Sequence, residues 1–222
     1  MIRGLHWVCI LSLVLSMKCD RRPSLPEGWD RLGYFPLVPG ATWTFSGPYG
    51  RVVLSDSSTQ AGRNREGASS EFRLDFVDGS PSPRLQEVFV VSGDQIYWRD
   101  FKLPYLPLIT FDPPLPVLPP SSRAGDSLVV DSNEQWRDSV ETSFAIRGVL
   151  TVVGVEDVSV PAGDFKDCIR VRQAILYEDL SVPHLFTWIE LWYAKGVGWV
   201  QYVSEAGSGK LVSAMVGDMR YP

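Results

Sequence analysis

The feature that most constrains the fold of this chain is its division into short apolar segments separated by turn-forming residues. The segments are rich in Val, Ile, Phe, Tyr, Trp and Thr, which favour extended backbone, and Gly, Pro, Ser and Asp separate them. Ten segments read as strands: 42–45, 51–55, 71–77, 84–91, 95–99, 139–160, 164–178, 185–194, 198–205 and 210–217. No window carries an amphipathic helical period of useful length. The sequence therefore predicts an all-β, antiparallel fold.

Glycine-bearing turns join these segments. In "VPAGD", Pro161 presets φ for a β-turn, and Gly163 takes the left-handed conformation that closes a tight hairpin. Gly196 has the same role in "YAKGV", and Gly93 and Gly207 mark further hairpins. Because hairpins place consecutive strands side by side, the chain predicts an up-and-down meander. Such a meander forms a curved sheet, a half-barrel or a sandwich, and these shapes remain open at this point.

The stretch 103–122 differs from the strands because it carries seven prolines. Proline has no backbone N–H to donate to a ladder and favours polyproline geometry, so we expect no central strand here. The favoured interpretation is a Pro-rich crossover that packs Leu, Ile and Phe side chains against an edge of the sheet. The alternative is a docking ligand, since "PPLP" resembles what aromatic-lined grooves bind.

The first residues predict export. Residues 1–18 have a basic start at Arg3, an apolar run and a polar break, which is the layout of a signal peptide. The apolar run is too short to cross a bilayer core of about 30 Å. Cys19 follows directly, where a bacterial lipoprotein carries its lipidated cysteine, although Lys18 departs from the small residue that normally precedes it. We therefore predict lipidation of Cys19 and a membrane anchor; the alternative is a soluble secreted protein.

After the signal peptide we expect a tether over 19–33 and one β domain over 34–222, because the chain length suits a single core. The signal peptide holds two of the 21 basic residues and no acidic one, so 19 basic residues oppose 26 acidic ones in the rest. The resulting charge of −7 disfavours nucleic acid as a partner, since phosphate binding needs clustered cations.

The densest group of reactive side chains lies in "SVPAGDFKDCIRVR", which follows the VPAG turn. If this segment is a strand, side chains alternate between its two faces. Asp167 then diverges from both Asp164 and Cys168, so the cluster does not converge on a metal or a substrate. We interpret it as a hairpin that leads into an amphipathic strand.

Two features keep a catalytic alternative open. The same alternation puts Cys168 on one face with Arg170 and Arg172, whose charges would stabilise a thiolate. His184, the sole histidine after the signal peptide, completes a conceivable nucleophile pair with Cys168. One histidine and so few cysteines cannot build a usual zinc site, and no cofactor motif fits, so we predict neither metal nor cofactor.

The segment 185–194 is apolar on both faces. Trp188 and Trp192 share one face with Glu190 between them. The other face carries Ile189, Leu191 and Tyr193. An open sheet packed on one side would have a polar outer face. Two apolar faces are instead expected in a curved sheet whose concave side is lined by side chains, or in a closed sandwich. We name four candidate ligand-binding residues: Trp188, Trp192, Arg170 and Arg172.

Three motifs carry a resemblance to a known group: "YFPLVPGATWTF" (34–45), "VSVPAGDFKDCIRV" (158–171) and "LWYAKGVGWV" (191–200). Together they resemble a widespread group of bacterial lipoproteins and secreted proteins of unknown function. The resemblance covers most of the expected domain and implies export and a β-rich fold, with no catalytic residues to carry over. By a looser analogy of fold, the group is similar to periplasmic lipoprotein carriers, whose curved antiparallel sheet holds acyl chains.

The sequence thus predicts a non-enzymatic cell-envelope lipoprotein that faces the periplasm and binds an apolar ligand or an envelope protein partner. The alternative from another class is a thiol-dependent or hydrolytic enzyme that uses Cys168 and His184. A third is a structural surface module that acts through the proline stretch.

Overall fold

The computed structural model describes residues 30–48, 50–56, 70–77, 85–119, 124–137, 142–179 and 187–222. Within these residues the chain forms one short helix, α1 (Arg31–Tyr34), and thirteen strands. The strands are β1 (Thr42–Phe45), β2 (Arg51–Asp56), β3 (Ser70–Val77), β4 (Leu85–Ser92), β5 (Gln95–Lys102), β6 (Leu108–Pro116), β7 (Ser127–Arg137), β8 (Thr142–Val160), β9 (Gly163–Tyr177), β10 (Trp188–Ala194), β11 (Gly198–Ser204), β12 (Gly207–Val216) and β13 (Met219–Tyr221). Each predicted segment coincides with a strand to within a few residues; β6, β7 and β13 are additional.

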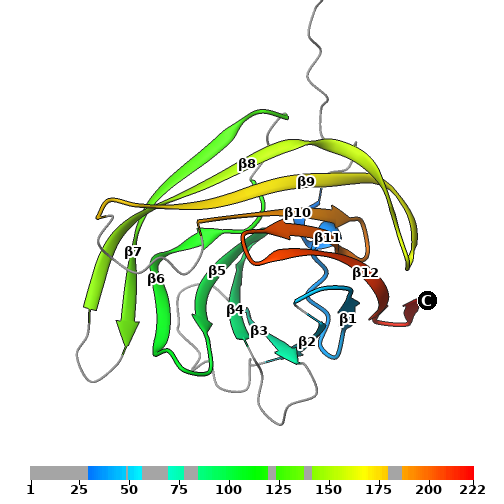
Figure 1. Ribbon diagram of the computed structural model, residues 1–222, viewed down its shortest axis with the longest axis horizontal. Coiled ribbons are helices and arrows are strands. Elements are labelled where there is room, and N and C mark those ends of the chain that lie inside the picture. The colour runs from blue at the N-terminus through cyan, green and yellow to red at the C-terminus, as the bar shows by residue number, and fades with distance from the viewer. Residues whose placement is uncertain are drawn as a thin grey trace, which may run out of the picture.

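The described strands form one antiparallel sheet in which each strand pairs with the next along the chain, so the predicted meander is confirmed. The sheet curls until β1 pairs with β12, and β1 to β12 thereby close a barrel (Figure 1). In this closing ladder Trp43 lies opposite Ala214. β13 stands outside the closure and pairs with β12 alone. Of the shapes that the sequence left open, the curved sheet is the one that forms, and it closes fully.

The predicted glycine turns are present. Gly163 pairs with Val160 across the β8–β9 hairpin and has a φ of 133°, which L side chains rarely adopt. Gly196, in the turn between β10 and β11, has a φ of 77°. These two positions need glycine because a Cβ would strain the backbone there.

The proline-rich stretch is partly a strand of the sheet, so the expectation that its prolines exclude a central strand is wrong for β6. This strand pairs with β5 on one side and with β7 on the other. The ladder between β6 and β5 is interrupted between Thr110 and Leu115, and Pro113 and Pro114 lie in this gap. The ladder between β6 and β7 ends at Asp112, before both prolines. Neither ladder requires an N–H from these two residues, so proline is tolerated. The apolar side chains of the stretch are buried as expected: Ile109, Phe111, Leu115, Val117 and Leu118.

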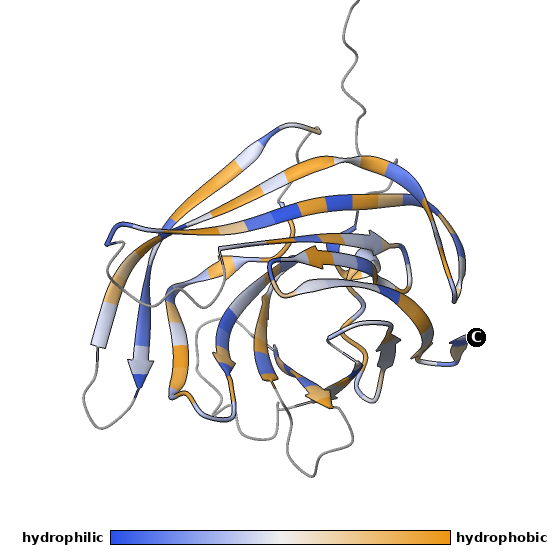
Figure 2. Ribbon diagram, in the orientation of Figure 1, coloured by the Kyte–Doolittle hydropathy of each residue, from blue (hydrophilic) through white to orange (hydrophobic). Residues whose placement is uncertain are grey.

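The long β8–β9 hairpin arches over β10, β11 and β12 (Figure 1). Hydrophobic and hydrophilic residues alternate along both strands (Figure 2), as expected where one face packs and the other meets solvent. The tip returns to β12, where the Ala162 N–H donates to the Leu211 carbonyl over 3.1 Å. Phe165 packs against Tyr221 of β13, with ring centroids 5.7 Å apart. These contacts hold the hairpin against the barrel.

Helices long and apolar enough to cross a membrane do not occur in the described part of the chain. The same residues contain no group of three or more His, Cys, Asp or Glu side chains that could hold a metal ion.

Candidate functional site

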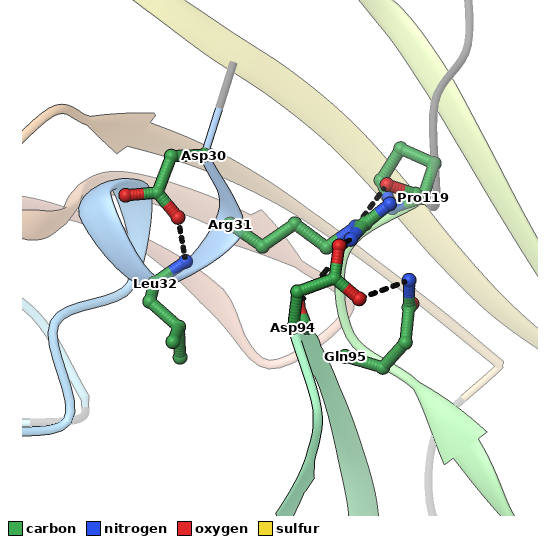
Figure 3. A network of polar contacts seen from close by, with 6 residues as sticks. All are labelled: Asp30, Arg31, Leu32, Asp94, Gln95 and Pro119. Carbon is green, nitrogen blue, oxygen red and sulfur yellow. Dashed lines mark hydrogen bonds and ion pairs between the residues drawn. The ribbon is translucent and has the colours of Figure 1, made fainter. Parts of the chain in front are cut away.

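One end of the barrel is closed by α1. Asp30 caps the helix, because its carboxylate accepts a hydrogen bond from the Leu32 N–H over 3.1 Å. The buried Arg31 donates from Nε to the Pro119 carbonyl over 2.9 Å and forms an ion pair with Asp94 through Nη1 (Figure 3). The hydrogen bond from Arg31 holds the pKa of Asp94 below its usual value. These bonds tie α1 to the β4–β5 turn and to the chain that follows β6.

Phe35, directly after α1, extends this closure into the barrel. Its ring stacks on Trp199 with centroids 5.3 Å apart, and it meets Phe89 and Tyr193 edge-on at 5.4 and 5.8 Å. Antiparallel connections alternate between the two ends of a barrel, so α1 lies at the end that holds the β4–β5 turn. The interior is therefore plugged at that end by aromatic side chains.

On the other side of this plug the barrel holds a cavity of about 220 Å³. Six of the described lining residues are aromatic: Phe76, Phe89, Trp98, Phe101, Tyr193 and Trp199. Six more are aliphatic: Leu85, Leu103, Val117, Ile189, Leu191 and Ala206. An apolar cavity of about 150 Å³ accommodates a benzene molecule, so this one has room for a ring with several additional heavy atoms.

The cavity reaches the surface at the β11–β12 turn, at the end opposite α1. Glu205 and Ala206 form this turn, line the cavity and are exposed. The Glu205 carboxylate accepts hydrogen bonds from the Thr187 hydroxyl and from the Thr187 N–H, the latter over 3.4 Å. The turn is thus tied to the start of β10, and a ligand can enter beside it.

Glu87 is the polar member of the row of side chains that β4 contributes to the cavity wall. Leu85, Glu87 and Phe89 alternate along β4, and all three line the cavity. Across the ladders Glu87 lies opposite Leu74 of β3 and Phe101 of β5, which have no polar side-chain atoms. Within the described residues, its carboxyl forms no hydrogen bond and no ion pair.

Burial raises the pKa of Glu87 to about 8. By accessible surface the side chain is only partly buried, and it lines the cavity inside the barrel. The pKa of Tyr193 is also raised, mainly by burial and to a lesser degree by the charge of Glu87. At neutral pH both groups are therefore mostly uncharged, and the wall around them is apolar and neutral.

The four predicted ligand-binding residues come together on the face of β9 and β10 opposite to the cavity. The Arg170 guanidinium lies over the Trp192 ring at 4.8 Å, and that of Arg172 lies over Trp188 at 5.0 Å. Glu190 joins the two pairs, accepting from Arg170 Nε over 2.9 Å and lying 3.9 Å from Arg172 Nη1. None of the four lines the cavity; from β10 the lining residues are Ile189, Leu191 and Tyr193. That the four bind a ligand stays a prediction.

The reactive cluster of the β8–β9 hairpin does not converge. Asp164 and Asp167 are exposed, whereas Cys168 is fully buried. Lys166 pairs with Asp157 over 2.6 Å, and the Asp167 N–H donates to the same carboxylate over 3.2 Å. The cluster is thus a set of local hairpin contacts, which agrees with its interpretation from the sequence.

Cys168 does not have the stabilised thiolate that the catalytic alternative requires. The register shift between β8 and β9, with Asp167 at a φ of 51°, lies before Cys168, and from Cys168 to Arg170 the pairing with β8 is continuous. Cys168 therefore shares a face of β9 with Arg170 and Arg172, as the alternation predicts, but its side chain is fully buried. Burial raises the pKa of Cys168 to about 12, and the nearby carboxylates of Asp157 and Asp167 act in the same direction. The thiol is therefore protonated at physiological pH.

Three predicted features lie outside the described residues: the signal peptide, Cys19 and His184. Lipidation of Cys19 and the pairing of Cys168 with His184 stay predictions.

Sequence reasoning did not find Glu87, although the segment 84–91 holds a signal for it. In "RLQEVFVV" the row Leu85, Glu87, Phe89, Val91 is apolar except for one acid. A single carboxylate within an apolar row marks either a strand with an exposed face or a buried acid. The closure of the barrel places Glu87 in the wall of the cavity, where it is partly buried.

A comparison with protein-family models finds no match, and a comparison with curated proteins finds no significant one. Among solved structures, the chain is similar to a "putative lipoprotein" from Parabacteroides distasonis ATCC 8503, a crystal structure at 2.70 Å resolution. The TM-score is 0.48 and the sequence identity 12%, and the match covers 84% of this chain and 100% of that one.

Proposed function

We propose that this protein is a non-enzymatic binding protein of the cell envelope, whose barrel holds a small and mainly apolar molecule. The observation that carries this proposal is the cavity of about 220 Å³, with six aromatic rings in its wall, a plug at one end and contact with the surface at the other. Ligand sites are typically concave and mostly apolar with few polar groups, and the mouths of β-barrels are among their usual places.

The volume supports a small ligand. Sites for drug-sized molecules measure about 300–1,000 Å³, and a cavity of about 150 Å³ accommodates one benzene ring. A volume of about 220 Å³ lies between these two and suits a ring with a short substituent. It is too small for the whole acyl chain that the analogy with lipoprotein carriers implies.

Export and a lipid anchor at Cys19 complete the proposal, and they rest on the sequence of the first residues alone. A role without catalysis is supported by Cys168, whose fully buried thiol has a pKa of about 12. No feature of the described residues favours the thiol-dependent enzyme.

Binding of tert-butylbenzene, a neutral apolar probe, tests the proposal. We expect saturable shifts in NMR signals of cavity residues and a rise in melting temperature, because the probe binds the folded protein alone. Ala206→Trp places an indole at the mouth and is expected to abolish these effects. Leu176→Trp adds the same indole at an exposed position of β9 that does not line the cavity, and it is expected to preserve them. Absence of saturable binding to the unaltered protein would overturn the proposal.

A further inference from the structure

The charged groups that line the cavity are acidic. Glu87 lies in the wall and Glu205 at the mouth, and the described lining residues include no Lys, Arg or His. Arg170 and Arg172 of β9 point to the opposite face, where Arg170 pairs with Glu156 and Glu190, and Arg172 pairs with Glu190. Once Glu87 is ionised, the electrostatic potential of the cavity therefore favours a cation and opposes a carboxylate.

Glu87 lacks the partners that satisfy Glu134, a fully buried acid of the barrel. The Glu134 carboxylate of β7 accepts hydrogen bonds from Trp136 Nε1 over 2.6 Å and from the Tyr177 hydroxyl over 2.7 Å. Glu87, which is partly buried, has no counterpart to either donor within the described residues. A carboxyl in an apolar wall is poorly solvated, and a cation in the cavity would supply the partner that it lacks.

Two neutral polar side chains, Gln173 and Ser204, also line the cavity, and each donates a hydrogen bond to a backbone carbonyl, that of Val117 over 3.0 Å and that of Gly207 over 3.2 Å. The Tyr193 hydroxyl and Trp199 Nε1 are fully buried and present no surface to the cavity. A ligand therefore meets the ring carbons of these residues. Aromatic rings attract cations through their quadrupoles, which adds to the attraction of Glu87.

Glu87 is the group in the wall whose charge changes near neutral pH. Leu74 of β3 and Phe101 of β5 lie opposite to it, and Gln173 of β9 is neutral. Tyr193 of β10 faces it with a raised pKa, so the phenol stays uncharged. At the mouth, Glu205 is exposed and bonded to Thr187. A response of ligand affinity between pH 6 and 9 therefore reports on Glu87.

We infer that the natural ligand of this cavity is a small apolar molecule with an organic ammonium group, which the Glu87 carboxylate and the surrounding rings hold. This inference rests on the proposed function and adds the chemical class of the ligand. Binding removes the proton from Glu87, because the ionised carboxylate is the form that pairs with the cation.

Two probes of equal shape test the inference: phenyltrimethylammonium, whose charge is permanent, and tert-butylbenzene, in which carbon replaces the charged nitrogen. At pH 9 we expect the cation to bind at least about tenfold more tightly, since both the ion pair and the cation–π contacts favour it. The apparent dissociation constants are measured by calorimetry or NMR titration on the full mature chain.

The pH dependence has a definite sign. With a Glu87 pKa of about 8, the ionised form falls about tenfold for each pH unit below that value. The apparent affinity for phenyltrimethylammonium is therefore expected to weaken at least about tenfold from pH 9 to pH 6, as the ionised fraction falls, until it reaches the affinity of the protonated form. The affinity for tert-butylbenzene does not require ionisation and is expected to stay level or to rise slightly as the pH falls.

Glu87→Gln keeps the side-chain shape and removes the charge. The two probes are then expected to bind with similar affinity, and the pH dependence of the cation is lost. Glu178→Gln is the matched control, because it removes one negative charge at an exposed position that does not line the cavity. It is expected to preserve the tighter binding of phenyltrimethylammonium over tert-butylbenzene and the pH dependence of that binding. Glu87→Leu serves as a second variant and is expected to bind the cation more weakly than the neutral probe.

The outcomes separate this inference from the proposed function. If tert-butylbenzene binds and phenyltrimethylammonium does not bind more tightly at pH 9, the ammonium inference is overturned while the proposed function stands. The same follows if the preference persists in Glu87→Gln. If neither probe binds, the proposed function itself fails.

Discussion

Cys168 shows how burial overrides the chemistry that a strand pattern predicts. It shares a face of β9 with Arg170 and Arg172, because its pairing with β8 is continuous from Cys168 to Arg170. The thiol is nevertheless fully buried, just after the bulge at which Asp167 takes a left-handed φ of 51°, which Asp tolerates better than most residues. Its electrostatic environment there is acidic, since Asp157 and Asp167 lie near it.

The reactivity of Cys168 follows from this environment. At pH 8 a pKa of about 12 leaves about one thiol in 10,000 ionised, against roughly a quarter for an ordinary cysteine. In a chain with Cys9 and Cys19 replaced by serine, we expect the folded protein to react with a disulfide reagent at least about 1,000-fold more slowly than in urea. Reaction rates within about tenfold of each other would show that the thiol is accessible and activated.

At the scale of elements, the closing contact between β1 and β12 depends on close backbone approach. The Ser46 N–H, just after β1, donates to the Lys210 carbonyl of β12 over 2.9 Å. Gly209 lies next to this bond, and a Cβ there would overlap the Ser46 carbonyl and the Tyr202 ring. A side chain at this position would push the two strands apart.

Gly209→Ala is therefore expected to reduce the free energy of unfolding by about 2 kcal/mol, as overpacking typically does. For a chain of this length this lowers the melting temperature by roughly 4–8 °C. Thermal unfolding followed by circular dichroism measures the change. Gly154→Ala is the matched control, because a Cβ at Gly154 in β8 meets no atom within 4 Å, and its effect is expected to stay within about 0.5 kcal/mol. Equal effects of the two substitutions would contradict this account of the closure.

At the scale of the whole molecule, the two ends of the barrel have different roles. The chain enters at Asp30, beside the plug that α1 and Phe35 form, and the cavity reaches the surface at the opposite end, beside Glu205 and Ala206. The anchor proposed at Cys19 precedes the plugged end in the chain, so the proposal leaves the mouth of the cavity, at the opposite end, free for a ligand.

The anchor itself is tested by Cys19→Ser. Without a thiol to lipidate, the protein is expected to move from the membrane fraction to the soluble fraction, because a lipid chain contributes about 0.8 kcal/mol of membrane affinity for each buried CH₂. Metabolic labelling with a fatty-acid probe is expected to disappear in parallel. Membrane association and labelling that persist in the variant would mean that the first residues are not a lipoprotein signal.

Most of the fold could be predicted because its signals are local. The hairpins at Gly163 and Gly196 are specified by a few adjacent residues, and the strands around them follow from composition. β7 was missed because its sequence, "SLVVDSNEQWR", is largely polar. β6 was missed because proline is a poor strand residue, and only the interrupted ladders on both of its sides make Pro113 and Pro114 acceptable.

By itself, the sequence determined the all-β class, the order of the strands and the opposite faces of β10, because turn geometry and alternation act over a few residues. Only the tertiary structure decided that β1 meets β12 and which face of β10 looks inward. It also decided that Glu87 is enclosed, since its neighbours Leu74, Phe101 and Tyr193 come from three other strands. The candidate site depends on that enclosure, because the raised pKa of Glu87 is caused by its surroundings and not by the residue type.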